Sequence, residues 1–253
     1  MIYPPEMMPI NFRGTQQKQH RLPPPPLIKL LFFTLVCIFL LSGCVRSSDF
    51  HIKNFAKTDI DVISEIHMNQ AISLLKTLTQ KLYKRNPFEL QKGNGQTMDS
   101  RLNQIFQCPA LEKHPELNFK DSTDAILLGL EPEFKGDRIF ALMVGLYTMI
   151  HKSYNSKCEL FMLDYLNEQT LYNSARNIEI FVWRLKNRYK DNGQLFVLTN
   201  SLDGEVENLS YERIFGKLVS LQDTMALIVA TRTGRVIKEV VQIAGMAFFP
   251  IGI

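Results

Sequence analysis

The spacing of apolar residues along the chain predicts helices over most of its length. Between positions 59 and 84, Ile60, Ile63 and Ile66 open a series of apolar residues that recur mostly three or four apart, with polar residues between them. That spacing places them on one face of a helix that ends before Asn86-Pro87. The same reasoning predicts further helices at 99–106, 121–130, 137–154, 167–188, 210–232 and 235–249.

These helices together predict an all-α fold. The helix expected at 137–154 is apolar on nearly every side, so it should lie at the centre of an irregular multi-helix bundle. Gly145 within it would let a neighbouring helix approach closely. The stretch 86–96 is rich in turn-forming residues and is expected to be a loop. The predicted helical domain extends from residue 57 to residue 253.

A separate apolar run precedes this domain. Leu30–Leu41 contains twelve residues with only Thr34 interrupting it, which is short of the roughly 20 that span a bilayer. One acid, Glu6, and four basic residues lie upstream: Arg13, Lys18, Arg21 and Lys29. A positive flank before a short apolar run is typical of a secretory targeting segment.

The four residues that follow this run, Leu41-Ser42-Gly43-Cys44, resemble the lipobox of bacterial lipoproteins. The resemblance implies that 1–43 is a signal peptide, that Cys44 is lipidated, and that 44–56 is a lipidated tether. Val45, where Asp would favour inner-membrane retention, implies by the same resemblance an outer-membrane anchor facing the periplasm. The alternatives are an ordinary signal peptide cleaved after Gly43 and an uncleaved N-terminal anchor.

The charge of the chain changes once the targeting segment is set aside. The whole sequence has 29 basic and 25 acidic residues, but four of the basic ones and one acid lie in 1–43. The remaining 210 residues carry 25 basic and 24 acidic side chains, a net charge of +1. A balance this even gives no indication of nucleic acid as a partner.

Two cysteines remain in the mature chain besides Cys44. Cys108 and Cys158 form an even pair, which in an oxidising compartment is a candidate disulfide, with two unconnected thiols as the alternative. No Cys-x-x-Cys or His-Glu-x-x-His spacing is present, so no metal and no cofactor is expected.

The densest polar cluster interrupts the helix expected at 167–188. Its members on that helix, and the acids on the following helix that would pair with them, are Asn173, Arg176, Asn177, Glu179, Trp183, Glu212 and Asp223. Buried charges are normally paired, so an interhelical salt-bridge and amide network is favoured over a polar pocket or partner groove. The segments LYNSARNIE and LSYERIFGKLVSLQD resemble stretches of a family of uncharacterised proteobacterial lipoproteins over residues 137–250, which brings no assigned activity.

The C-terminal stretch VVQIAGMAFFPIGI has fourteen residues without a charge. It is interpreted either as a last core helix whose end packs on the bundle or as an exposed patch around Phe248 and Phe249 that docks on a partner.

The sequence as a whole favours a lipid-anchored, periplasm-facing protein that binds other envelope proteins, as an accessory of an outer-membrane assembly or secretion complex. No catalytic residue is assigned, because nucleophile-elbow and phosphate-loop motifs are absent from the sequence. Two alternatives stay open: a peptidoglycan-type hydrolase using Glu168 or Glu179, and a carrier of an apolar ligand held between helices.

Overall fold

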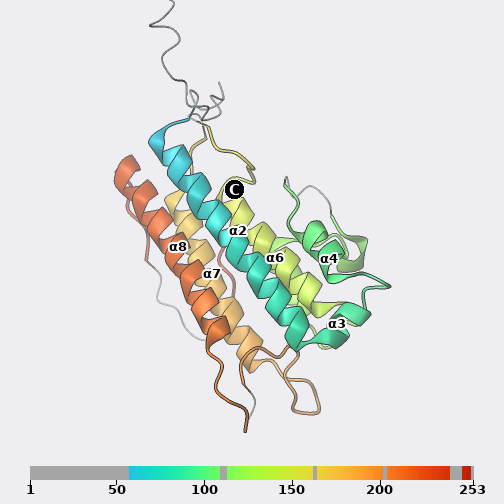
Figure 1. Ribbon diagram of the computed structural model, residues 1–253. Helices are drawn as coiled ribbons and strands as arrows, with labels where there is room; N and C mark the ends of the chain where they lie inside the picture. The colour runs from blue at the N-terminus through green and yellow to red at the C-terminus, as the bar shows by residue number, and fades with distance from the viewer. Residues whose placement is uncertain (1–56, 109–112, 162–163, 202–203, 240–246, 252–253) are drawn as a thin grey trace, which may run out of the picture. The chain divides into compact units, whose positions relative to one another are not determined.

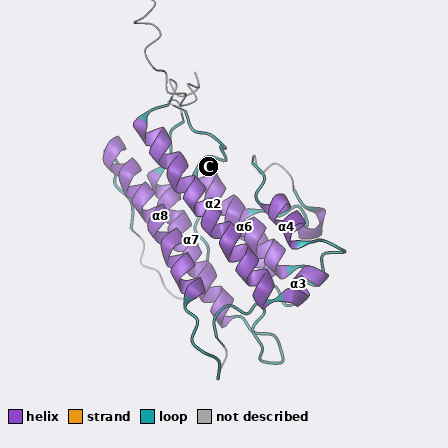
Figure 2. Cartoon of the chain, viewed as in Figure 1, coloured by secondary structure: helices purple, strands orange, loops and turns teal. Residues whose placement is uncertain are grey.

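The computed structural model describes residues 57–108, 113–161, 164–201, 204–239 and 247–251. These form seven α-helices, one short 3-10 helix and no β-strand, apart from an isolated bridge between Tyr189 and Leu195 (Figures 1 and 2). The predicted all-α class is therefore confirmed. The predicted signal peptide at 1–43, Cys44 and the predicted tether at 44–56 lie outside the described residues.

Four long helices form the framework of the domain: α2 (Asp59–Arg85), α6 (Arg138–Ser153), α7 (Glu168–Asn187) and α8 (Ser210–Thr233). α2 contacts α6 and α8, and α7 also contacts α6 and α8, so the four close into a ring. Side-chain pairs show that neighbours are antiparallel. Lys81 near the end of α2 donates to Ser210 at the start of α8, and Tyr83 donates to Asp137 just before α6. The arrangement is an up-down-up-down four-helix bundle (Figure 1).

The connection between α2 and α6 carries the short helices. They are α3 (Pro87–Gln91), α4 (Met98–Ile105), the 3-10 helix η2 (Pro115–Leu117) and α5 (Ser122–Gly129). α4 and α5 both pack on α6, and α4 also contacts α2. Because α6 is covered on both sides, fourteen of its sixteen residues are buried, as its all-round apolar sequence predicts.

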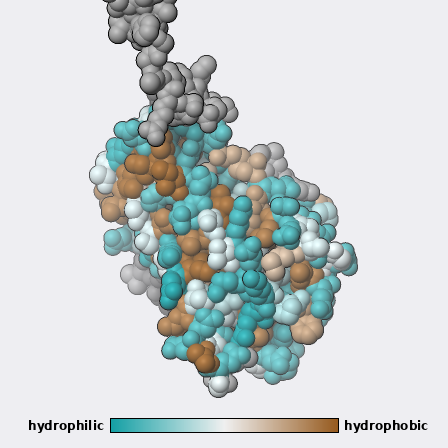
Figure 3. Space-filling model, viewed as in Figure 1, coloured by the Kyte–Doolittle hydropathy of each residue, from teal (hydrophilic) through white to brown (hydrophobic). Residues whose placement is uncertain are grey.

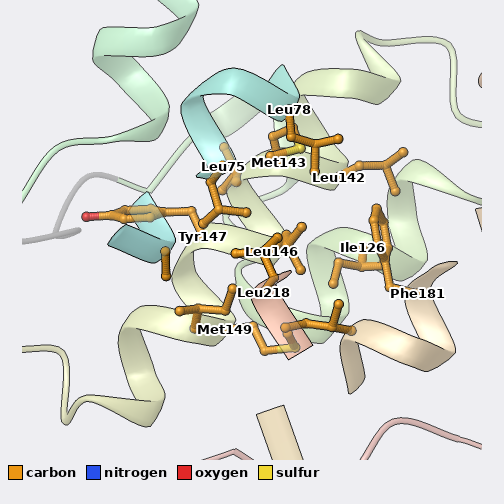
Figure 4. Close-up of a cluster of buried hydrophobic side chains, with 14 of the residues drawn as sticks. Leu75, Leu78, Ile126, Leu142, Met143, Leu146, Tyr147, Met149, Phe181 and Leu218 are labelled. Atoms are coloured by element: carbon orange, nitrogen blue, oxygen red, sulfur yellow. The ribbon is translucent and has the colours of Figure 1, made fainter. Parts of the chain in front are cut away.

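The core lies where the other helices meet α6. Figure 4 shows Leu75 and Leu78 of α2, Ile126 of α5, Phe181 of α7 and Leu218 of α8 converging on the side chains of α6. Full burial of each large apolar side chain contributes roughly 1.5–3 kcal/mol. This packing, rather than intrinsic helix propensity, holds the bundle together.

Gly145 is where α5 approaches α6 most closely. A Cβ atom at this position would lie 2.6 Å from the carbonyl oxygen of Ser122 and 2.7 Å from Cγ1 of Ile126. The predicted role of Gly145 is confirmed, because a side chain there would push α5 away.

The structure corrects three sequence-based predictions. In the first half of α2, Ile63 and Ile66 are exposed, and the buried face continues from Leu75 back through Ala71 and Met68 instead. The expected loop at 86–96 contains α3, because Pro87 is tolerated in the first turn of a helix. The helix expected at 235–249 is wrong for the described residues 235–239 and 247–249, which are not helical.

Candidate functional site

The polar cluster on α7 contains an ion-pair network that joins α7 to α8. The guanidinium of Arg176 lies 2.7 Å from Asp223 of α8 and 3.4 Å from Glu179 one turn along its own helix. Burial raises the pKa of both carboxyls, and the charge of Arg176 opposes that rise. Arg176 thus pairs with both carboxylates, as the network interpretation predicts, and the three groups together carry one negative charge when both acids are ionised.

Glu212, expected in the same cluster, lies apart from this network. Glu212 is eleven positions before Asp223 on α8, a separation of about 16 Å along the axis. It lies 2.6 Å from Lys186 and accepts a hydrogen bond from Asn200. Burial raises the pKa of Glu212, but these two hydrogen bonds outweigh it, so the net shift is downward. Trp183, one turn after Glu179 on α7, is 39% exposed.

The amides of the cluster bind the backbone of the C-terminal segment. Asn177 is fully buried; its Nδ2 donates to the carbonyl of Phe249 at 2.8 Å, and its Oδ1 accepts the N–H of Phe249 at 2.6 Å. One turn earlier, Asn173 donates to the carbonyl of Pro250 at 3.1 Å. A further turn earlier, Gln169 makes the same two-bond contact with the backbone of Lys238. Side-chain amides spaced four residues apart on α7 thus satisfy backbone N–H and C=O groups that a neighbouring strand would satisfy in a sheet.

The same segment carries Phe248 and Phe249, predicted as a candidate partner patch. Both are half-buried. Phe248 packs against the edge of the core, and its ring lies 4.9 Å from the guanidinium carbon of Arg184. The structure thus places these two residues against α7, where the segment lies along the helix and does not protrude into solvent.

A buried charge network missed by the sequence analysis lies at the start of α6. Arg101 of α4 is fully buried and binds Glu116 through both terminal nitrogens, at 2.6 and 2.8 Å. Its Nε lies 3.3 Å from Oδ2 of Asp137, which also accepts the hydroxyl of Tyr83 at 2.8 Å. The only hint in the sequence is that Arg101 lies four residues before Ile105, on the inward face of its helix.

Burial is the largest influence on the pKa values of Asp137 and Arg101 in this network. Burial raises the pKa of Asp137 to about 6, although hydrogen bonds from the Phe140 N–H and the Tyr83 hydroxyl oppose the rise. Burial lowers the pKa of Arg101, but Glu116 and Asp137 outweigh it, so its net shift is upward and it stays charged. Every charge described here has a partner, which is typical of a structural network.

Cys108 and Cys158 are joined in a disulfide with Cα atoms 5.7 Å apart, which links the end of α4 to the segment after α6. His151 is buried in the last turn of α6, with Nε2 at 3.3 Å from Sγ of Cys108 and 3.1 Å from the carbonyl of Lys157. These three side chains have the donor types of a metal site, and their donor atoms lie within 4.8 Å of one another. Because each sulfur is bonded to the other, the oxidised form offers only His151 as an effective ligand.

An open hollow of about 650 Å³ lies where α2 ends. It is lined by α3 and by the turn that contains the bridge between Tyr189 and Leu195. Phe88 and Tyr189 on its rim are 73% and 55% exposed. Asn86 fixes one wall, because its amide donates to the carbonyl of Leu198 at 2.8 Å and accepts the Leu198 N–H at 2.7 Å. We call this feature the distal hollow.

Searches against protein-family models, curated proteins and solved structures gave no match to this chain. α8 is long and apolar enough to cross a membrane by length and composition alone, a test that core helices also pass. Here α8 packs against α7 and α2 as a member of the bundle. What the structure defines is thus the class of the domain, a four-helix bundle whose loops are fixed by side-chain amides.

Proposed function

We propose that the protein is a lipid-anchored helical binding protein of the bacterial cell envelope. The lipobox Leu41-Ser42-Gly43-Cys44 supports the anchor, and the described domain begins at Lys57. The twelve residues between Cys44 and Lys57 reach at most about 40 Å, so the domain stays close to the membrane. α2 then runs 27 residues from the end nearest the anchor to the distal hollow, a length of about 40 Å.

The observation that carries a binding role is the distal hollow. Two exposed aromatic rings, Phe88 and Tyr189, flank a concave surface at the end of α2 opposite the tether. Aromatic side chains beside a hollow are typical of protein interfaces, because they bury a large area at little cost in conformational entropy. The partner expected there is another envelope protein, of the kind found in an outer-membrane assembly or secretion complex.

The interior gives less support to a carrier of an apolar ligand. α6 fills the centre of the bundle, and the most enclosed of the hollows discussed, beside His114 and Thr148, has a volume of only about 20 Å³. That volume is about the size of a single water site. Sites for small apolar ligands measure several hundred Å³.

A hydrolase receives equally little support from Glu168 and Glu179. Each would need a second carboxylate, and they do not supply it to each other, because they are eleven positions apart on α7, about 16 Å along the axis, whereas glycosidase carboxyl pairs lie at most about 9.5 Å apart. The carboxylate that shares a partner with Glu179 is Asp223, which lies 2.7 Å from Arg176. Glu179 is also engaged by Arg176, at 3.4 Å.

The experiment compares the acylated protein with two variants in envelope fractions. Cys44→Ser should move the protein from the membrane to the soluble fraction, because it loses the acyl chains. The double variant Phe88→Ala/Tyr189→Ala should stay in the membrane but lose proteins that crosslink to the wild type. Its matched control is Phe119→Ala, another exposed aromatic, which should retain them. Membrane retention of Cys44→Ser would contradict the anchor, and equal crosslinking by both aromatic variants would contradict the binding surface.

A further inference from the structure

The outward face of α2 changes character along the helix. Val62, Ile63 and Ile66 are exposed and fall within an arc of about 100° at helical spacing. The next residues on that arc, Asn69 and Gln70, are exposed and polar. Apolar exposure is therefore confined to the first two turns, the end of α2 that continues into the tether.

Two more exposed apolar side chains lie at the same end of the bundle. A hollow of about 350 Å³ brings Tyr165 and Arg235 against the first turn of α2. Tyr165 is 79% exposed, and Val236, directly after Arg235, is 85% exposed. The hollow opens on the side of α2 that carries Asp61 and Ser64, whereas Val62, Ile63 and Ile66 lie on the outward face. We call Val62, Ile63 and Ile66 the proximal patch, with Tyr165 and Val236 as further exposed apolar side chains at the same end. Figure 3 shows apolar surface at the upper end of the bundle, toward which α2 begins and α8 ends in the same view of Figure 1.

The charges around the proximal patch are balanced. Lys57 lies 2.6 Å from Glu65, and Arg235 lies 3.7 Å from Glu168. Arg232 and Asp59, of opposite charge, are both exposed. Attraction to a charged surface therefore does not account for the patch, and an apolar surface is the expected occupant.

We propose that the proximal patch inserts into the interfacial region of the bilayer that holds the acyl chains of Cys44. This inference rests on the proposed function, because the anchor supplies the membrane. A tether of twelve residues keeps the patch within about 40 Å of the bilayer, so a weak apolar contact is strengthened by high effective concentration. The aliphatic side chains of the patch suit the boundary between headgroups and acyl chains, and Tyr165, at the same end of the bundle, is of a residue type enriched there. With the patch in the membrane, the distal hollow faces away from it.

The test places a spin label on the acylated full-length protein in vesicles of phosphatidylethanolamine and phosphatidylglycerol. Labels at Ile66→Cys and, separately, Val62→Cys report on the patch. Val206→Cys, exposed in the loop before α8, is the matched control at the other end. The native disulfide leaves the introduced thiol as the labelled one. Collision rates with oxygen, which concentrates in lipid, and with a water-soluble nickel chelate are measured.

The ratio of oxygen to nickel collisions should be severalfold higher at positions 62 and 66 than at position 206. Equal ratios at the three positions would overturn the proposal. Shielding of positions 62 and 66 from both reagents would also overturn it, because a second copy or another part of the chain would then cover the patch. The intact mass of the protein distinguishes failure of the proposed function from failure of this inference. Absence of acyl chains on Cys44 contradicts both. An acylated protein whose labels are exposed to water contradicts this inference alone.

Discussion

Replacing Asp137 with asparagine should remove a pH-dependent part of the stability of the bundle. The Asp137 carboxylate is fully buried, caps α6 by accepting the Phe140 N–H at 3.0 Å, and accepts the Tyr83 hydroxyl at 2.8 Å. Arg101 Nε lies 3.3 Å away. An asparagine at this position would keep the shape and the cap of the side chain but would not titrate.

The sign of the effect follows from the raised pKa. Burial raises the pKa of Asp137 from 3.8 to about 6 in the folded protein, so the folded state binds the proton more tightly than the unfolded state does. The resulting stabilisation is fully present below pH 4 and is lost as the pH rises through 6. A rise of about two units corresponds to about 3 kcal/mol in total, of which about 1.3 kcal/mol should appear between pH 7 and pH 5.

Urea unfolding of the wild type and Asp137→Asn at pH 7 and pH 5 measures this effect. The free energy of unfolding of the wild type, relative to the variant, should increase by about 1.3 kcal/mol on going to pH 5. The comparison between the two proteins cancels other titrating groups, such as His151, whose pKa burial lowers. Asp124→Asn, which changes an exposed aspartate in the first turn of α5, is the control. A difference that is constant with pH, or that shrinks at pH 5, would show that the hydrogen bonds and Arg101 stabilise the carboxylate more than burial penalises it.

Three further predictions follow from the packing. Asn177→Ala removes both hydrogen bonds to the Phe249 backbone. It should lower the free energy of unfolding by about 1–3 kcal/mol and should increase hydrogen exchange at residues 247–251. Asn187→Ala, which removes an exposed amide on the same helix, should have neither effect. Cys108→Ser/Cys158→Ser opens a closed loop with a sequence separation of 50 and should lower the unfolding free energy by about 4 kcal/mol; an unchanged urea midpoint under oxidising conditions would contradict this. Gly145→Ala places a Cβ 2.6 Å from the Ser122 carbonyl oxygen and should destabilise the folded protein by about 1–3 kcal/mol. At Gly216 nothing lies within 4 Å of a new Cβ, so Gly216→Ala should be neutral or stabilising. Thermal melting of both variants measures the difference.

The helical segments were predictable because helix formation depends on neighbours within one or two turns. The apolar repeats of α2, α6, α7 and α8 and the N-caps Asp137 and Asn167 are all visible in the sequence. The spacing of apolar residues does not, however, decide which face of a helix points inward when both faces carry apolar side chains, as in the first half of α2. Ile63 and Ile66 therefore looked buried from their spacing, although they are exposed. They lie on the outward face of α2, because the buried face passes through Asp61 and Ser64 in the first turns, and these polar residues hide that face in the apolar pattern of the sequence.

The sequence by itself determined the all-α class and the central place of α6, while an anchor at Cys44 stays a prediction from the resemblance of Leu41-Ser42-Gly43-Cys44 to a lipobox. Only the tertiary structure decided which polar side chains meet, because their partners are far apart in the chain: Asn177 and Phe249 are 72 residues apart, and Tyr83 and Asp137 are 54 apart. The predicted polar cluster accordingly separates into an ion-pair network, an amide clamp and a distant carboxylate. Arg101 was missed for the same reason, since a buried charge is tolerated only where folding brings its partners to it.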